Sequence, residues 1–201
     1  MKDLKHLYEF EKLLESANNA LVQQACAEGK HALAYTCYHM PEVLLNTGNC
    51  FSVRLRAPLT GSLDISYYMS NFICDYCKSL LERGIEGGYN FLSGLMGTET
   101  CSEMNRALEH FELLRLVDNE QFFVTFLDMP FKVTENTVRH YVDQLRRKVL
   151  TPLQEVYGVD VSDDALRKAV AEHNEVCRIL TEIGQFRKEE NPRITGYEYH
   201  I

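Results

Sequence analysis

The sequence contains no apolar run that approaches the roughly 20 residues of a membrane-spanning helix. It also contains no lysine- and arginine-rich run: 21 basic residues stand against 29 acidic ones, for a net charge of −8 over 201 residues. A chain of this charge is a poor partner for nucleic acid or for an anionic membrane surface. Its first residues, MKDLKHLYEFEKLLES, mix charges with helical apolar spacing and are not a secretory signal. We therefore expect a cytoplasmic protein that binds neither nucleic acid nor membrane.

Several common motifs for nucleotide binding and hydrolysis are also missing. The stretch GIEGGYNF does not have the GxGxxG order of a dinucleotide-binding loop, and neither GKS nor GKT occurs. No segment has the form of a serine-nucleophile elbow. The sequence therefore gives no support for an ATPase or a hydrolase.

Cysteine, in contrast, is abundant, with seven residues in the chain. Without a secretory signal, disulfide bonds are not expected, which leaves buried thiols, metal or cluster ligands, and redox chemistry. Cys74 and Cys77 have the spacing of a thioredoxin-like pair, but no strand leads directly into them. The same spacing is half of a zinc site, yet no second Cys-x-x-Cys or His pair follows. Four other cysteines are interpreted as small packing residues: Cys26, Cys37, Cys50 and Cys177.

The spacing of apolar residues predicts strands that alternate with helices. Strands are expected at 31–37, 50–55, 89–98 and 121–130, and helices at 3–28, 41–48, 74–84 and 101–116. Residues 57–71 are rich in Pro, Gly, Ser and Asn and are expected to be irregular. Alternation of this kind is typical of βαβ units. We therefore expect an α/β fold, a Rossmann-like layer domain whose parallel sheet has helices on both faces.

Beyond residue 134 the pattern changes to two long helices, which follow the N-terminal helix and the α/β unit. The first is expected to run from a Thr134 cap to Gly158, and the second to begin at a Ser162 cap.

These patterns divide the chain into three parts: an N-terminal helix (1–29), an α/β domain (30–133) and a helical segment (134–201). The last residues, NPRITGYEYHI, stop without a cap or a polar tail. We therefore expect the chain to be the first part of a longer two-domain protein.

Cys101 follows a predicted strand directly and stands at the start of a predicted helix. Ligands of open α/β sheets bind just beyond the carboxyl ends of the strands, and a helix N-terminus favours a thiolate. Cys74 likewise opens a predicted helix, from a different crossover of the same sheet. The two cysteines are therefore candidates for one metal centre; the alternative is that both fill helix–sheet packing.

Five stretches, in this order, resemble the 2-hydroxyacyl-CoA dehydratase family (D-component type), which also includes benzoyl-CoA reductase subunits. They are AYTCYHMPEVLLNTGNCFSVRL, CDYCKSLL, GYNFLSGLMGTETCSEMNRALEHF, FLDMP and YGVDVSDDALRKAVAEHNEVCRIL. The similarity extends from about residue 30 to the C-terminus and so covers most of the chain.

The resemblance implies a subunit of two parallel α/β domains with a [4Fe-4S] cluster between them, held by three cysteines. Residues 30–133 are then the cluster-binding domain, and the helical segment (134–201) leads to a second α/β domain that is absent from this chain. Carried over by motif, Cys74 and Cys101 are the first two ligands, and the third is expected outside this chain. Cys77 matches no required cysteine of the family and stays a possible ligand. Thiolates are suitable ligands for such a cluster.

The resemblance also implies a reaction, the radical dehydration of an (R)-2-hydroxyacyl-CoA to a 2-enoyl-CoA, which makes the chain part of a lyase. The electron is expected from a separate, ATP-dependent iron–sulfur activator protein. The other expected partners are the CoA-thioester substrate and either a homologous second subunit, in a heterodimer, or a second copy, in a homodimer.

Glu42 is the candidate catalytic residue, although family members commonly carry a second acid where this chain has Val43. Arg54 and Arg56 are candidates for phosphate contacts to CoA, with surface ion pairs as the alternative role. Two other functions stay open. One is a subunit of a related ATP-dependent iron–sulfur reductase, of the benzoyl-CoA reductase or double-cubane cluster type; the other is a truncated, inactive or assembly-only protein.

Overall fold

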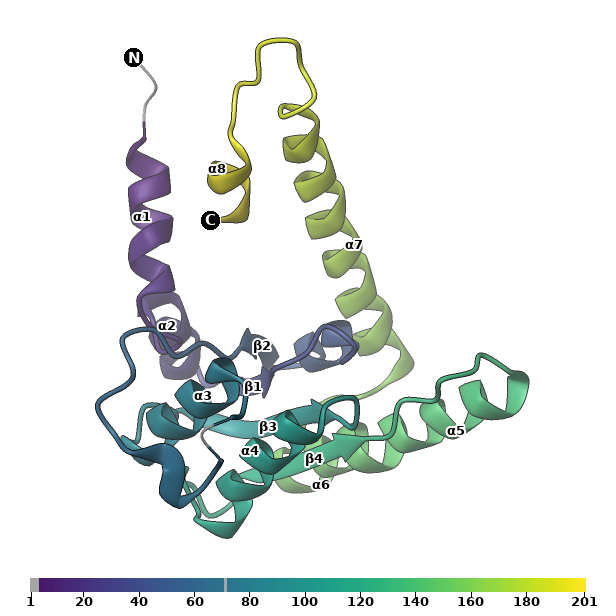
Figure 1. Cartoon of the computed structure of the whole chain (residues 1–201). Coiled ribbons are helices and arrows are strands. Elements are labelled where there is room, and N and C mark those ends of the chain that lie inside the picture. The colour runs from purple at the N-terminus through teal and green to yellow at the C-terminus, as the bar shows by residue number, and fades with distance from the viewer. Residues whose placement is uncertain (1–3, 71) are drawn as a thin grey trace.

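The computed structural model describes residues 4–70 and 72–201, and its centre is a four-stranded sheet in which all strands are parallel (Figure 1). The strands are β1 (His31–Tyr35), β2 (Cys50–Arg54), β3 (Leu92–Thr98) and β4 (Phe123–Leu127), in the spatial order β2-β1-β3-β4. Each lies within a stretch that the apolar spacing predicts as a strand. The predicted α/β class with a parallel sheet is therefore confirmed.

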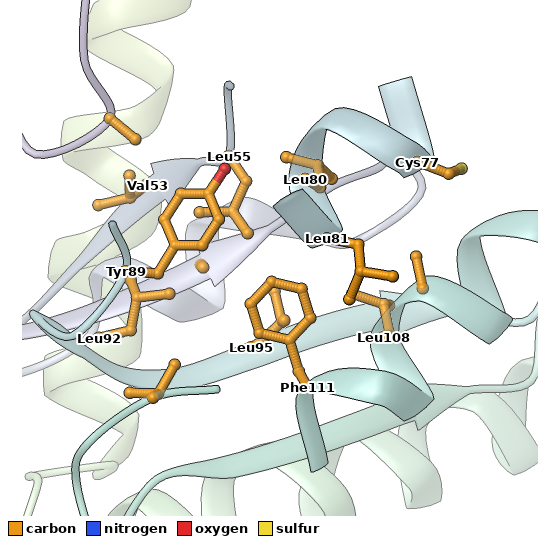
Figure 2. Packing of buried hydrophobic residues seen from close by; sticks show 14 of the residues in the cluster. Val53, Leu55, Cys77, Leu80, Leu81, Tyr89, Leu92, Leu95, Leu108 and Phe111 are labelled. Carbon is orange, nitrogen blue, oxygen red and sulfur yellow. The ribbon is translucent and has the colours of Figure 1, made fainter. Parts of the chain in front are cut away.

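One face of the sheet is covered by α3 (Asp75–Ile85) and α4 (Ser102–Leu113), with α2 (Ala20–Ala27) against β1. Fully buried side chains from these helices and from the strands form the larger core, among them Leu80, Leu95, Leu108 and Phe111 (Figure 2). Burying one such side chain contributes about 1.5–3 kcal/mol. This core fixes α3 and α4 on the sheet.

Gly97 in β3 allows α4 to lie close to the sheet. A Cβ atom at this position would lie closer than 3.0 Å to Cδ1 of Leu108, a fully buried side chain of α4. The middle of α4 therefore lies close to β3.

The opposite face is covered by residues of the predicted helical segment. They form one helical run, which consists of α5 (Glu135–Leu145), a π-helical turn (Arg146–Leu150) and α6 (Thr151–Tyr157). Val149 and Leu153 of this run are fully buried in a cluster with Leu33 and Met96 of the sheet. Helices thus cover both faces, as expected.

The predicted starts of the two long helices, at Thr134 and Ser162, and the predicted end of the first one, at Gly158, are confirmed. The Thr134 and Ser162 side chains each accept a hydrogen bond from a backbone N–H in the first turn, of α5 and of α7 (Asp163–Gln185) respectively. Gly158 ends α6 in the left-handed conformation, with φ of 64°, which glycine adopts without steric cost.

The single helix expected at 3–28 is wrong in extent. The described part of this stretch, from residue 4, forms two helices, α1 (Lys5–Leu14) and α2; residue 3 lies outside the described residues. The break occurs because the Asn19 side chain accepts two backbone N–H groups and so starts a new helix.

The helix expected at 41–48 is also wrong, because the structure has only a short 3₁₀ turn there, Glu42–Asn46. The Asn46 side chain donates to the Glu42 carbonyl oxygen and accepts the Ser52 N–H. These bonds close the turn against β2 and leave no length for an α-helix.

Two long elements project from the α/β part of the molecule. The helices α1 and α7 extend to the same side of it, and the short α8 (Gly196–His200) lies between them (Figure 1). Within the described residues, no helix combines the length and the apolar character needed to cross a membrane.

The irregular stretch expected at 57–71 is confirmed for its described residues, except for a short 3₁₀ turn, Ile65–Tyr67; residue 71 lies outside them. Glu82 of α3, only 3% exposed, holds this stretch in place. Its carboxylate accepts the backbone N–H groups of Gly61, Ser62 and Leu63 at 2.7–3.1 Å. Burial by itself raises the pKa of Glu82, but these bonds outweigh it and lower the pKa below its ordinary value.

We predict that Glu82→Gln lowers the free energy of unfolding at pH 7 by about 1–3 kcal/mol, because a neutral amide leaves buried N–H groups without acceptors. Urea unfolding followed by circular dichroism measures the loss. A carboxyl group whose pKa is lower in the folded than in the unfolded protein stabilises the fold at a pH above its unfolded-state pKa, which is about 4.3 for glutamate. This contribution disappears as the pH falls through the folded-state pKa. The difference between variant and wild type should therefore narrow in acid.

Glu112→Gln, on the exposed surface of α4, is the matched control because it makes the same chemical change without removing such bonds. Equal losses of stability in the two variants would show that Glu82 has no special role.

Candidate metal centre

The carboxyl ends of the strands lie along one edge of the sheet, because all four strands are parallel. The strands β1 and β3 are neighbours, yet the chain leaves β1 toward β2 and leaves β3 toward β4. Their following loops therefore diverge, which makes the place between them the usual binding position of an open α/β sheet.

Two cysteines stand at helix N-cap positions at this edge, and neither side chain makes a capping hydrogen bond to the described residues. Cys74 is the N-cap residue of α3 and Cys101 that of α4, so the prediction that both open helices is confirmed. The two helix starts also meet, because the backbone N–H of Cys74 donates to the carboxylate of Glu103, in the first turn of α4, at 2.9 Å. Two helix N-termini side by side favour negative charge such as a thiolate.

Potential metal ligands gather at this junction. The sulfur atoms of Cys74 and Cys77 and a carboxylate oxygen of Glu103 all lie within 4.8 Å of one another. Cys77 stands one turn after Cys74, so the two side chains share one face of α3. Thiolates and carboxylates in such a group are ligands for zinc and iron.

The group is open on one side and closed on the other. Cys74 is exposed, whereas Cys77 is only 1% exposed and lies at the edge of the apolar core (Figure 2). Burial, followed by the neighbouring Cys74, Cys101 and Glu103, raises the pKa of Cys77 to about 12. A bound cation reverses this effect, because a coordinated thiol loses its proton.

The group differs from the predicted pair in its members. Cys101 is not a member of the group, although it stands two residues before Glu103. Cys77 is a member, although it was predicted only as a possible ligand. Glu103 was missed by sequence reasoning. The signal for it was an acidic residue in the first turn of the helix that Cys101 opens.

The cysteines interpreted as packing residues have different environments. Cys50 is buried and Cys26 is partly buried against the larger core, as expected, and Cys37 is half-buried in the loop after β1. Cys177 is exposed on α7, where its sulfur lies 3.4 Å from Nε2 of His173, so the packing prediction is wrong for this residue. The reason is that α7 projects beyond the α/β part, so this side chain has no core to enter (Figure 1).

Glu42 lies at the same edge of the sheet, in the turn that follows β1. Its carboxylate accepts a hydrogen bond from the Tyr35 hydroxyl at 2.9 Å. Burial, followed by this contact, raises the pKa of Tyr35 to about 12. A cleft of about 350 Å³ opens here, and Glu42, Tyr35, Arg54 and His173 are among its lining residues.

Comparison with known proteins gives a consistent result. Residues 37–201 match the model of the family described as 2-hydroxyglutaryl-CoA dehydratase, D-component. The chain is 21% identical over 178 residues to the (R)-phenyllactyl-CoA dehydratase beta subunit of Clostridium sporogenes, which covers 89% of this chain and 46% of that protein.

A second relative is the (R)-2-hydroxyglutaryl-CoA dehydratase, subunit beta, of Acidaminococcus fermentans. The chain is 22% identical to it over 184 residues, which covers 87% of this chain and 47% of that protein. The chain therefore spans about half the length of both relatives.

We predict that iodoacetamide at pH 8 labels Cys74 and Cys101 at least about tenfold faster than Cys77 in the reduced, metal-free protein, because the thiolate is the reactive form. Cys77 is inaccessible and its raised pKa keeps it protonated. Mass spectrometry of peptides gives the rates. In the same sample, buried Cys50 should react slowly and exposed Cys177 quickly. Equal rates at Cys74 and Cys77 would contradict this arrangement.

Proposed function

The chain belongs to the 2-hydroxyglutaryl-CoA dehydratase D-component family, and from this premise we propose that it is the cluster-holding part of a dehydratase subunit. Its substrate is then an (R)-2-hydroxyacyl-CoA and its product a 2-enoyl-CoA. The observation that carries the proposal is the meeting of two helix starts with cysteine at the N-cap position at the sheet edge, within the part of the chain that matches the family.

The donor set suits an iron–sulfur cluster. Cys74 and Cys101 stand at positive helix ends, where a thiolate is favoured, and thiolates are the ligands that such clusters require. We assign these two residues as ligands of a [4Fe-4S] cluster, with a third ligand from outside this chain. When bound, the cluster supplies one-electron chemistry.

The reaction explains why one-electron chemistry is needed. Dehydration removes the hydroxyl group from C2 and a proton from C3, and the two leave as water, so the overall reaction is redox-neutral. The C3 proton of a thioester is too weakly acidic for ordinary base-catalysed elimination. One electron must therefore enter at the start and be returned at the end, and we assign its delivery to a separate ATP-dependent iron–sulfur activator.

Glu42 is placed to handle the proton in this scheme. Its carboxylate faces a cleft at the edge that also holds the cysteines, and it already accepts one hydrogen bond, from Tyr35. A carboxylate held within reach of a substrate is a standard proton acceptor. Partner subunits follow from the relatives, both of which are named as beta subunits; we propose that this chain pairs with a homologous subunit.

We predict that anaerobic iron–sulfur reconstitution loads less iron onto the wild-type chain than a complete [4Fe-4S] cluster contains, because the third ligand is assigned outside the chain, and that Cys74→Ala and Cys101→Ala each lose most of the bound iron. Absorbance near the charge-transfer bands, EPR and iron analysis measure the loading. Cys177→Ala, a change at an exposed thiol on α7, should keep the wild-type iron content. Equal iron in the wild type and in Cys101→Ala would refute the assignment of Cys101.

Two further results would redirect the proposal. Retention of zinc in place of iron, with loss of zinc in Cys74→Ala and Cys77→Ala, would indicate a structural zinc site in the group of Cys74, Cys77 and Glu103. A wild-type chain that binds no metal at all would favour an assembly role.

A further inference from the structure

A second cavity, of about 670 Å³, shares Arg54 with the Glu42 cleft as a lining residue. It is bordered by β2, by the end of α1 and the start of α2, and by the C-terminal α8. Its polar lining comes from Asn19, Ser52, Arg54, Arg56, Tyr76 and His200. Among the described residues that line it, none is an aspartate or a glutamate, although the chain as a whole carries a net charge of −8.

Two arginines face this cavity without a counter-charge. Arg54 is the last residue of β2 and Arg56 follows it two positions later, and both side chains line the cavity. Within the described part of the chain, neither is paired with a carboxylate: the guanidinium groups that form ion pairs belong to other arginines. Two like charges at close range repel each other unless an anion lies between them.

Arg56 also has hydrogen-bonding capacity to spare. A guanidinium carries five N–H donors, but among residues 4–70 and 72–201 Arg56 makes only one long bond, from a terminal nitrogen to the Leu13 carbonyl oxygen at 3.4 Å. Its Nε is buried without a partner. Burial, followed by the charge of Arg54, lowers the pKa of Arg56, so the protonated form is held at a cost that a bound anion would offset.

We propose that Arg54 and Arg56 form a binding site for a phosphate group, and that the phosphate is one of those carried by the CoA thioester. The identification of the ligand as CoA rests on the proposed function, whereas the anion site rests on the cavity and its two unpaired arginines. Arginine suits this role because its planar donors match the oxygen atoms of a phosphate.

The position of Arg54 links this site to the proposed chemistry. Arg54 borders both the larger cavity and the Glu42 cleft. Its charge also acts on Tyr76, which lies on α3 between Cys74 and Cys77. A ligand with its phosphates at the arginine pair therefore extends toward the edge of the sheet where Glu42 and the cysteines lie.

The test is calorimetric titration of the full chain with CoA, with pantetheine, which carries no phosphate, and with inorganic phosphate. We expect CoA to bind, pantetheine not to bind, and inorganic phosphate to compete with CoA. Arg54→Gln should weaken CoA binding by about tenfold, the range of one lost charge-assisted hydrogen bond. Arg146→Gln, the same change at an exposed arginine that does not line the cavity, should leave affinity unchanged.

Folding is controlled separately, because Arg56 also holds the end of α1 through Leu13. Arg54 is exposed and makes no such bond, so Arg54→Gln tests the site even if Arg56→Gln loosens the helix. Circular dichroism checks both variants. Unchanged CoA affinity in Arg54→Gln, or pantetheine binding as tight as that of CoA, would overturn the proposal. Binding of inorganic phosphate alone at the arginines would overturn the CoA assignment and retain the phosphate site.

The iron measurements separate this inference from the proposed function. Arg54→Gln should keep wild-type iron loading, and Cys74→Ala should keep wild-type CoA affinity. Normal iron loading in a chain that binds no phosphate at the arginines would contradict only this inference. Phosphate binding at the arginines in a chain that holds no iron would contradict only the cluster assignment.

Discussion

The structure depends on the need of a parallel sheet to be covered on both faces. Strand β3 is buried along its whole length, so helices must lie above and below it. The crossovers that carry α3 and α4 supply one layer, and the run from α5 to α6 supplies the other. Because the strands are parallel, each crossover helix starts near the carboxyl edge of the sheet, even where a long irregular stretch precedes it as before α3, and the helix starts therefore lie at one edge. The site at that edge is thus a consequence of core formation.

The carboxyl edge of the sheet holds side chains that favour a bound cation and a side chain that favours a bound anion. The starts of α3 and α4 meet through the hydrogen bond between Cys74 and Glu103, and they collect thiols and a carboxylate that favour a cation. Arg54, at the end of β2, is a cation without a paired carboxylate among the described residues and favours an anion. Each group is incomplete alone. Buried acidic groups such as Cys77 stay protonated without a metal, and adjacent arginines repel each other without an anion.

Local patterns were sufficient to predict the strands, the caps at Thr134 and Ser162, and the position of Cys74 and Cys101 at helix starts. They were insufficient where a contact joins distant segments: Cys74 and Glu103 are 29 positions apart, and only the packing of α3 beside α4 brings them together. The break at Asn19 was missed because apolar spacing continues across it, although a side chain that caps a helix stands there. The exposure of Cys177 depends on how far α7 extends beyond the core, which periodicity does not encode.

The arginines and the cysteine-bearing edge lie at different places, and this separation favours one orientation of the proposed ligand, a CoA thioester. A phosphate-bearing thioester has its charge at one end and its reacting group at the other. In the reverse orientation, its phosphates would lie near the carboxylate of Glu103, where like charges repel. With the phosphates at Arg54 and Arg56, the repulsion is replaced by attraction, and the thioester end is directed to the cysteine-bearing edge. The same parallel topology that brings the candidate metal ligands together therefore also favours the orientation that we propose for this ligand.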